Sequence, residues 1–370
     1  MGGPLAGLRV VELQARGPGP FGVMILADLG AEVTRVAAPG QAEAAGADDR
    51  SGTERMISGR RRIDLVARGR RRLVEANLKD AAGREAVLGL IEAADVLVEG
   101  FRPGVAERLG VGPEACQARN PRLVYARITG WGQSGPYAQV PGHDINYVAL
   151  SGVLDALRRD ERPPAPPLNL LGDYGGGGML LVVGILAALV ERAASGTGQV
   201  VDAAMIDGVS LLSTLLHGLR AEGLWNEMPG QNVLDLGAPF YNVYETADRR
   251  YLTIGCGEPR FYATLLDAIG LGEQREELLR GQADPATWPA GKARLAAVFL
   301  SKTLAQWSEL LEGTDTCFAP VLTLGEAPHH PHNRARATFV EVDGIMQPAP
   351  APRFSRTPLS PAQAAGAGRD

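Results

Sequence analysis

Short apolar runs that end in glycine or proline recur along the first part of the chain. The first run, LRVVEL at 8–13, is followed by QARGPGP, which is typical of a buried parallel strand ending in a loop. The segment FGVMILADLG at 21–30 has helical spacing with Gly30 as a C-cap, and AEVTRVAAP at 31–39 has the composition of a strand. Strand, helix and strand in this order predict a right-handed βαβ unit.

The alternation of strands and helices then continues. Strands are predicted in DVLVEGF at 95–101 and in LVYARITGWG at 123–132. Helices are predicted at 82–93 and near 105–109, whereas GVGPEACQARN at 110–120 is predicted to be a connection. This part of the chain is therefore predicted to be an α/β, Rossmann-like domain with a parallel sheet.

From residue 142 onward the pattern becomes helical. Apolar helices at 143–157 and 172–195 flank the proline-rich break RPPAPPLN. A short strand at 198–205 precedes a helix that ends near residue 222. The alternation of strands and helices in the first part of the chain therefore does not continue beyond residue 142.

A β-hairpin and several helices follow. The segment 236–255 predicts the hairpin, with its turn at TADRR. Helices are predicted near 258–270, 290–300 and 303–312, and the chain beyond Pro331 is predicted to be loop-like. These elements indicate a second, smaller α+β lobe.

Length, charge and cysteine content narrow the classes of function. A chain of 370 residues is long enough for two domains or for one domain with an inserted lobe. Its net charge of -5 gives no general reason to expect nucleic-acid binding. MLLVVGILAALV is shorter than a membrane span and is predicted to be a buried helix. The N-terminus lacks the pattern of a secretory signal and the three cysteines lack CxxC spacing, so we expect a reducing, cytoplasmic location without a zinc site or disulfides.

Asp173 stands before four consecutive glycines in LLGDYGGGGMLL. An aspartate at the start of a helix is commonly an N-cap, which is the simpler explanation of its position. Four glycines, however, cost a helix roughly 1 kcal/mol each relative to alanine. Backbone N–H groups without side chains could instead stabilise an oxyanion or a phosphate. The glycine run is therefore interpreted as a place where a ligand approaches the backbone.

His143 and Glu258 also stand at predicted helix starts. His143 in GHDINY could be a polar residue of a first helical turn, a partner of its neighbour Asp144, or a base aimed at a substrate. Glu258 in GCGEPRFY could simply favour the positive end of a helix dipole. Helix starts that carry His143 and Asp173 could converge on one pocket.

The arginine-rich segment 55–79 allows several explanations. It could be a solvated face or a nucleic-acid arm, but the acidic total and the lack of interleaved aromatics argue against the second. A small phosphorylated ligand agrees better with its charge. EGFRPG at 99–104 adds Arg102 at the end of a predicted strand, where α/β sheets bind ligands. A GxGxxG motif is absent, so dinucleotide binding has little support.

Taken together, the motifs resemble those of the class III coenzyme A transferase superfamily, and within it those of the α-methylacyl-CoA racemase branch. The resemblance runs from GPLAGLRVVEL to APRFSRT and so covers nearly the whole chain. Between these ends it includes ADLGAEVTRV, DVLVEGFRPGV, ARITGWGQSGPY, GHDINYVALSG, PPLNLLGDYGGG and QVVDAAMIDG. Any one of these motifs is weak, but their occurrence in the family's order is highly specific.

The resemblance implies roles for particular residues. His143 and Asp173 would face opposite sides of the α-carbon of a 2-methylacyl-CoA, one removing and the other returning the proton, and Glu258 would support the histidine. The enolate formed on the thioester would be stabilised by helix N–H groups at GDYGGGG. The positions that would contact the substrate or its CoA part are Arg35, Leu78, Lys79, Gly100, Phe101, Arg102, Arg108, Tyr147 and Gly175. The wider segment 68–79 would belong to the same CoA-binding surface.

The resemblance also implies an assembly and leaves competing activities. It implies an interlocked homodimer without metal or redox cofactor, with no nucleic-acid or membrane partner. A CoA transferase with Asp173 as nucleophile is one alternative, although such enzymes usually carry GYD where this chain has GHD. A non-catalytic acyl-CoA-binding protein is the other. The expected division is a large domain at 1–190 and 335–370, linker helices at 191–224, a small domain at 225–320 and a return linker at 321–334.

Overall fold

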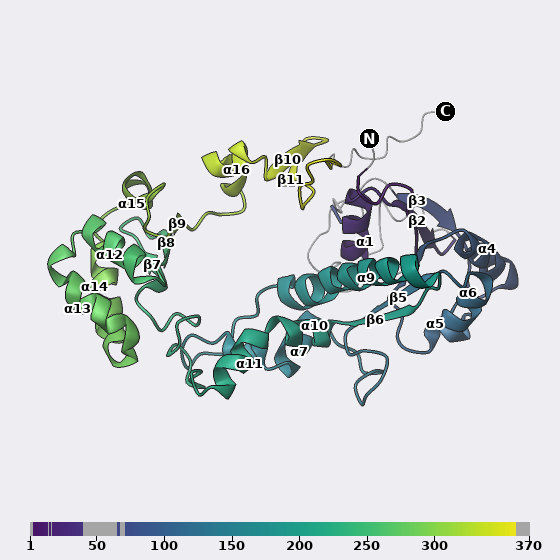
Figure 1. The fold of residues 1–370 in the computed structure, drawn as a ribbon, viewed down its shortest axis with the longest axis horizontal. Coiled ribbons are helices and arrows are strands. Elements are labelled where there is room, and N and C mark those ends of the chain that lie inside the picture. Colours follow the sequence, from purple (N-terminus) through teal and green to yellow (C-terminus); the bar gives the residue numbers. More distant parts are fainter. Residues whose placement is uncertain (1–2, 14, 16, 40–64, 67–70, 360–370) are drawn as a thin grey trace. The chain divides into compact units, whose positions relative to one another are not determined.

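The computed structural model describes residues 3–13, 15, 17–39, 65–66 and 71–359 (Figure 1). The chain forms two compact units. The large unit comprises 1–151, 167–213 and 331–370, and the small unit comprises 152–166 and 214–330. The separate linkers at 191–224 and 321–334 remain a prediction from the sequence.

The large unit is built on a parallel sheet, as the sequence predicts. Within the described residues, six strands occur in the order β3-β2-β1-β4-β5-β6, and every neighbouring pair is parallel. Chain order reverses between β1 and β4, which is the point where Rossmann-like sheets bind ligands at the carboxyl ends of their strands. The strands are β1 (Arg9–Glu12), β2 (Glu32–Ala37), β3 (Arg71–Glu75), β4 (Val96–Glu99), β5 (Val124–Thr129) and β6 (Val200–Ala204).

Alternating side chains of the central strands form two separate cores. In β5, Val124 and Ala126 belong to one apolar cluster with Leu181, whereas Tyr125 belongs to another with Ile91. Because successive strand residues point to opposite faces, helices cover both faces of the sheet. The large unit's helices are α1 (Pro18–Asp28), α4 (Ala81–Glu92), α5 (Val105–Arg108), α6 (Pro113–Arg119), α7 (Asp144–Leu150), the π-helix η1 (Leu170–Met179), α9 (Leu180–Ser195), α10 (Met205–Leu212) and α16 (Pro331–Ala335) (Figure 1).

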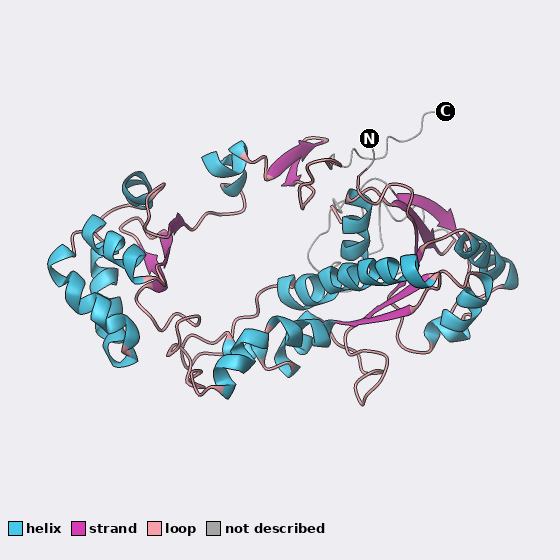
Figure 2. Cartoon of the chain, in the orientation of Figure 1, coloured by secondary structure: helices cyan, strands magenta, loops and turns pink. Residues whose placement is uncertain are grey.

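The small unit has its own core around an antiparallel sheet. Its strands pair in the order β7-β8-β9, next to the helices of this unit (Figure 2). Phe299 and Trp307 are fully buried in this core and make an edge-to-face contact with ring centroids 5.2 Å apart. This confirms the predicted hairpin and the α+β character of the lobe. The elements are α8 (Val153–Ala156), α11 (Thr214–Ala221), β7 (Tyr241–Glu245), β8 (Tyr251–Gly255), α12 (Pro259–Ala268), η2 (Gly272–Gln274), α13 (Arg275–Arg280), η3 (Gly281–Ala283), η4 (Pro285–Thr287), α14 (Trp288–Phe299), α15 (Leu304–Leu311), β9 (Phe318–Pro320) and η5 (Ala327–His329).

Two predictions of irregular structure are wrong. The connection at 110–120 contains α6, which starts at Pro113 and buries Cys116 against the sheet. Beyond Pro331 the chain forms α16 and the hairpin β10 (Phe339–Val342) and β11 (Ile345–Pro348). Both segments are short and rich in glycine, proline or charge, so tertiary packing and strand pairing outweigh weak local signals there.

The long apolar helix is only partly buried within this chain. η1 and α9 run continuously from Leu170 to Ser195, and this helix, which extends beyond MLLVVGILAALV at both ends, is long and apolar enough to cross a membrane by length and composition alone. Leu181 and Ile185 are buried against the sheet, whereas Val183 is 59% and Val190 75% exposed. The prediction of a buried helix therefore holds for one face, and the helix packs against β5 and β6 as a core helix does.

Candidate active site

His143 is the N-cap of α7, as predicted for a helix start. Its backbone N–H donates to Oδ1 of Asn146 over 3.0 Å, and its carbonyl accepts the N–H of Asn146 over 2.8 Å. These bonds fix the backbone, while the side chain of His143 is exposed. The imidazole is therefore held at a rigid helix start and is open to a ligand.

Asp144, the residue after His143, connects the two predicted catalytic helix starts. Its side chain is buried, and its Oδ2 accepts the backbone N–H of Asp173 over 2.6 Å. The carboxylate also lies against Gly172, where a Cβ atom would come within 2.6 Å of the same oxygen. The one signal for this role in the sequence is the position of Asp144 beside His143 in the GHD motif.

Asp173 lies inside the first turn of η1, so the simpler alternative, that it is an N-cap, does not hold. The helix begins three residues earlier, with Asn169 as its N-cap. Burial raises the pKa of Asp173 to about 6, and the negative charge of Asp144 adds to the rise, while the Asn169 amide and His143 oppose it. A carboxyl with such a pKa can both accept and donate a proton near neutral pH. His143 and Asp173 thus belong to one electrostatic neighbourhood in the large unit.

The loop after β1 closes one side of Asp173. Gly17 has a positive φ of 58°, and a Cβ there would stand 3.3 Å from Oδ2 of Asp173. Gly17 is also the N-cap of α1, whose N-terminus carries a partial positive charge. The carboxyl of Asp173 therefore sits at the carboxyl end of β1, next to the reversal point of the sheet.

Three of the four glycines serve helix packing rather than ligand approach. A Cβ on Gly177 would lie 2.9 Å from both Pro18 and Met205, so α1 and α10 close on this helix from two sides. Gly176 and Gly178 are also buried against these helices. The interpretation of the run as an open ligand surface is therefore wrong for these three residues. Gly175 is partly exposed and faces Leu212.

Tyr147 lies in α7, the helix that starts at His143. It is 5% exposed, stacks edge-to-face on Trp131 at 4.7 Å, and its ring fills the space that side chains at Gly130 and Gly142 would need. Burial raises the pKa of the Tyr147 phenol to about 12, and Asp173 and Asp144 contribute. The phenol therefore stays protonated, and the packing of Tyr147 on Gly142 fixes the chain just before His143.

Apart from Tyr147 and Gly175, the predicted CoA-binding residues lie on three segments of the large unit, namely within β2, after β3 and after β4. Gly100 follows β4, and a Cβ there would collide with Ala15 in the loop after β1. Arg102 and Arg108 are exposed on the segment that follows, and Lys79 is exposed just before α4. Arg35 is half-buried in β2, and Leu78 and Phe101 pack against the sheet's second core. Residues 68–70 of the predicted CoA-binding segment, and residues 55–64 and 67 of the arginine-rich segment, lie outside the described residues.

Glu258 belongs to the small unit, where it is the N-cap residue of α12. Its side chain accepts no capping hydrogen bond. The structural alternative therefore rests on the position of the carboxylate at the positive end of the helix dipole and not on a hydrogen bond. Its backbone carbonyl accepts the N–H groups of Phe261 and Tyr262, which holds it at the end of the turn after β8.

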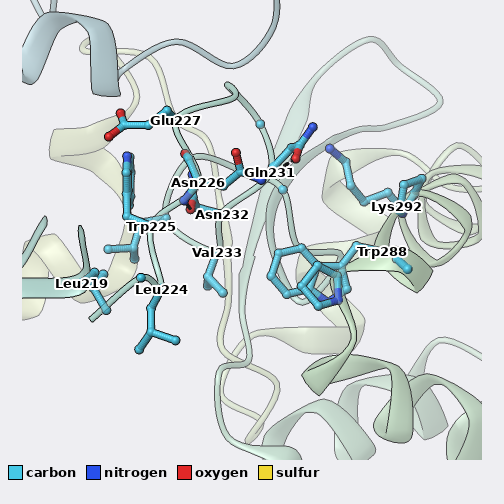
Figure 3. A pocket seen from close by; sticks show the side chains of 17 residues that line it. Leu219, Leu224, Trp225, Asn226, Glu227, Gln231, Asn232, Val233, Trp288 and Lys292 are labelled. Atoms are coloured by element: carbon cyan, nitrogen blue, oxygen red, sulfur yellow. Dashed lines mark hydrogen bonds between the residues drawn. The ribbon is translucent and has the colours of Figure 1, made fainter. Parts of the chain in front are cut away.

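A cavity of about 1170 Å³ lies entirely within the small unit. Figure 3 shows Trp288 and Lys292 of α14 on one side and Trp225 with Asn226 on the other. Lys292 donates to the carbonyl of Leu236 over 2.8 Å, and burial lowers its pKa. None of His143, Asp173 and Glu258 lines this cavity, so it is separate from the predicted chemistry.

Similarity to known proteins identifies the family to which the chain belongs. Residues 5–370 match the model of CoA-transferase family III, and the chain belongs to this family. An alpha-methylacyl-CoA racemase of Mus musculus is 47% identical over 359 residues, covering 96% of this chain and 88% of that protein. The Homo sapiens racemase is 43% identical over 358 residues with the same coverage. A CAIB/BAIF family protein from Brucella suis has a similar solved structure, with a TM-score of 0.80, 28% identity, and coverage of 99% of this chain and 96% of that one.

Proposed function

We propose that the protein is an α-methylacyl-CoA racemase, which interconverts (R)- and (S)-2-methylacyl-CoA thioesters through an enolate. The racemases of mouse and man that it resembles support this activity. The observation that carries the proposal is the raised pKa of Asp173, at about 6, beside an exposed His143. Racemisation needs two groups of near-neutral pKa, because each must act as base in one direction and as acid in the other.

The reaction follows from these two groups. In one direction Asp173 takes the α-proton as a carboxylate, and the electron pair of the C–H bond moves onto the thioester oxygen to form the enolate. Protonated His143 then returns a proton to the opposite face of the same carbon. Asp173 ends protonated and His143 neutral, which is the starting state for the reverse reaction, so no other reactant is consumed.

The start of α7 offers donors for the enolate oxygen. The N–H groups of His143 and Asn146 are already used at the start of α7, so the donors proposed for the enolate are those of Asp144 and Ile145 in the first turn. The N–H of Asp173 is occupied by Asp144, and Gly176, Gly177 and Gly178 behind it are buried. The proposed stabilisation of the enolate therefore lies at α7 rather than at the glycine run. One such donor typically lowers the barrier by about 3 kcal/mol.

We further propose that two copies interlock and that Glu258 acts in the assembled dimer, on the histidine. Support comes from apolar side chains that are exposed on helices of the single chain, namely Val183, Val190, Leu211, Leu212 and Leu215. Exposed apolar residues of this number on consecutive helices are typical of a protein interface. Sedimentation equilibrium should give twice the chain mass at micromolar concentration, whereas a stable monomer would contradict the dimer.

The activity is tested with one enantiomer of a 2-methylacyl-CoA in deuterated water. Loss of optical purity together with α-deuterium incorporation is expected. Exchange of the acyl group onto an added carboxylate without α-exchange would instead identify a transferase that uses Asp173 as nucleophile. His143→Ala should abolish racemisation, whereas His329→Ala, at another exposed histidine, should leave it unchanged.

A further inference from the structure

A buried ion network joins the two strands nearest the predicted CoA surface. Glu99 ends β4 and stands directly opposite Arg127 of β5 in the sheet register. Nε of Arg127 donates to Oε1 of Glu99 over 2.8 Å, and the two side chains are 7% and 0% exposed. Such a pair is enclosed by protein and not by solvent, so its geometry is fixed.

Both partners of this pair also hold the segment that follows β4. The second oxygen of Glu99 accepts the backbone N–H of Phe101 over 2.6 Å. The two terminal nitrogens of the Arg127 guanidinium donate to the two carboxylate oxygens of Glu107 of α5, over 2.8 and 3.3 Å. Arg127 thus donates through all three of its nitrogens, and one planar group connects β4, β5 and α5.

Stability alone does not explain this arrangement. Removing a carboxylate and a guanidinium from water is costly, and apolar side chains of similar volume often replace a buried ion pair without loss. The strands β4 and β5 are otherwise apolar and fully buried up to this point. What the network does beyond stability is to fix the backbone conformation of residues 99–108.

Two positively charged side chains of the segment 99–108 are exposed to solvent. Arg102 and Arg108 are exposed on this segment, and neither forms an ion pair with a carboxylate in the part of the chain that the structure describes. The chain just after this segment is held by Tyr125, whose hydroxyl donates to the carbonyl of Val111 over 2.9 Å. Two unpaired guanidinium groups on a rigid segment form a surface suited to phosphate groups.

We propose that Glu99, Arg127 and Glu107 are positioning residues that pre-orient Arg102 and Arg108 for the phosphates of the nucleotide end of an acyl-CoA. This inference rests on the proposed function for the identity of the substrate. It assigns the network to substrate affinity and not to proton transfer, because it touches neither His143 nor Asp173. Fixing the arginines before binding lowers the entropy lost on binding.

The test compares a full acyl-CoA with the matching acyl-pantetheine thioester, which lacks the nucleotide and its phosphates. In Glu107→Gln, Arg127 keeps its buried partner, so the fold is preserved. We expect KM for the acyl-CoA to rise about three- to tenfold with kcat nearly unchanged, as for loss of a half-exposed charge-assisted contact. KM for the acyl-pantetheine should stay the same, since the arginines have no phosphate to bind.

A matched control exists in the same unit. Arg119 of α6 lies between Glu85 and Glu92 of α4, at 2.8 and 2.7 Å, which is the same arrangement of one guanidinium between two carboxylates. Glu92→Gln makes the same chemical change away from the segment 99–108. It should leave KM for both thioesters unchanged.

A double variant removes the network without leaving a buried charge. Glu99→Leu with Arg127→Met should keep its melting temperature but raise the dissociation constant of free CoA about tenfold or more by calorimetry. Calorimetry with free CoA does not depend on racemisation, so failure of the proposed function and failure of this inference are distinguishable. Equal effects on acyl-CoA and acyl-pantetheine, or wild-type CoA affinity in the folded double variant, would overturn the inference.

Discussion

The buried carboxylate of Asp144 accepts the backbone N–H of Asp173 over 2.6 Å. This bond links the helix that starts at His143 to the helix that carries Asp173. It also places a second negative charge beside Asp173, which raises the pKa of that carboxyl in addition to the effect of burial. Asp144 therefore acts on both the position and the ionisation of the proposed acid and base.

Replacing Asp144 should change the pH dependence of the reaction. In Asp144→Asn the amide oxygen can still accept the Asp173 N–H, but the charge is gone, so the pKa of Asp173 should fall from about 6. In the direction in which Asp173 is the base, kcat/KM falls as pH drops through this pKa. The acid limb should move to lower pH by about half a unit to one unit. Asp155→Asn, at an exposed carboxylate, is the control, and an unmoved limb in Asp144→Asn would contradict the assignment.

Replacing Asp173 should stabilise the protein at neutral pH while abolishing activity. Its folded pKa of about 6 lies above the unfolded value of about 3.9. Its contribution to stability is therefore present below about pH 4 and is lost as pH rises through about 6. Asp173→Asn, which mimics the neutral carboxyl, should gain about 1–2 kcal/mol at pH 7.5 after allowance for solvent screening. Thermal unfolding at pH 4.5 and 7.5 checks this, and a lower melting temperature at pH 7.5 is the opposite result.

Adding a methyl group to Gly177 should destabilise the large unit. A Cβ there would stand 2.9 Å from Pro18 and Met205 and 3.0 Å from the carbonyl oxygen of Gly172. Overpacking of this kind costs typically 1–3 kcal/mol. Gly89→Ala is the matched control, because a Cβ at this helical position meets nothing within 4 Å. It should stabilise by up to about 1 kcal/mol. Equal melting temperatures for the two variants would refute the packing role.

Replacing Glu258 should separate chemistry from helix capping. Its side chain makes no capping bond, so Glu258→Ala should leave the melting temperature nearly unchanged while kcat falls by about tenfold to a thousandfold, the range expected for loss of an acid–base partner. Thr303→Ala is the comparison, because Thr303 caps α15 by accepting from Gln306. That variant should lose about 1 kcal/mol of stability and keep its kcat. A loss of stability without loss of kcat in Glu258→Ala would assign it a structural role.

Much of the fold could be predicted from local patterns. The runs at 8–13, 95–101 and 123–132 became β1, β4 and β5, because a short apolar segment between turn residues has few alternatives to a buried parallel strand. The position of His143 at a helix start is also predictable locally, because this residue stands at the head of an apolar run. By contrast, β3 is an edge strand with an exposed Leu73 and charged neighbours, and only its pairing with β2 makes it a strand.

The glycine run shows which information is local and which is not. That residues 175–178 carry no side chains is evident from the sequence alone. Whether a ligand or another helix occupies that space depends on α1 and α10, which are distant along the chain. The same holds for the bond from Asp144 to Asp173 across the proline-rich break. Such contacts are nonlocal, so their energies are set by burial and geometry that no periodicity along the chain encodes.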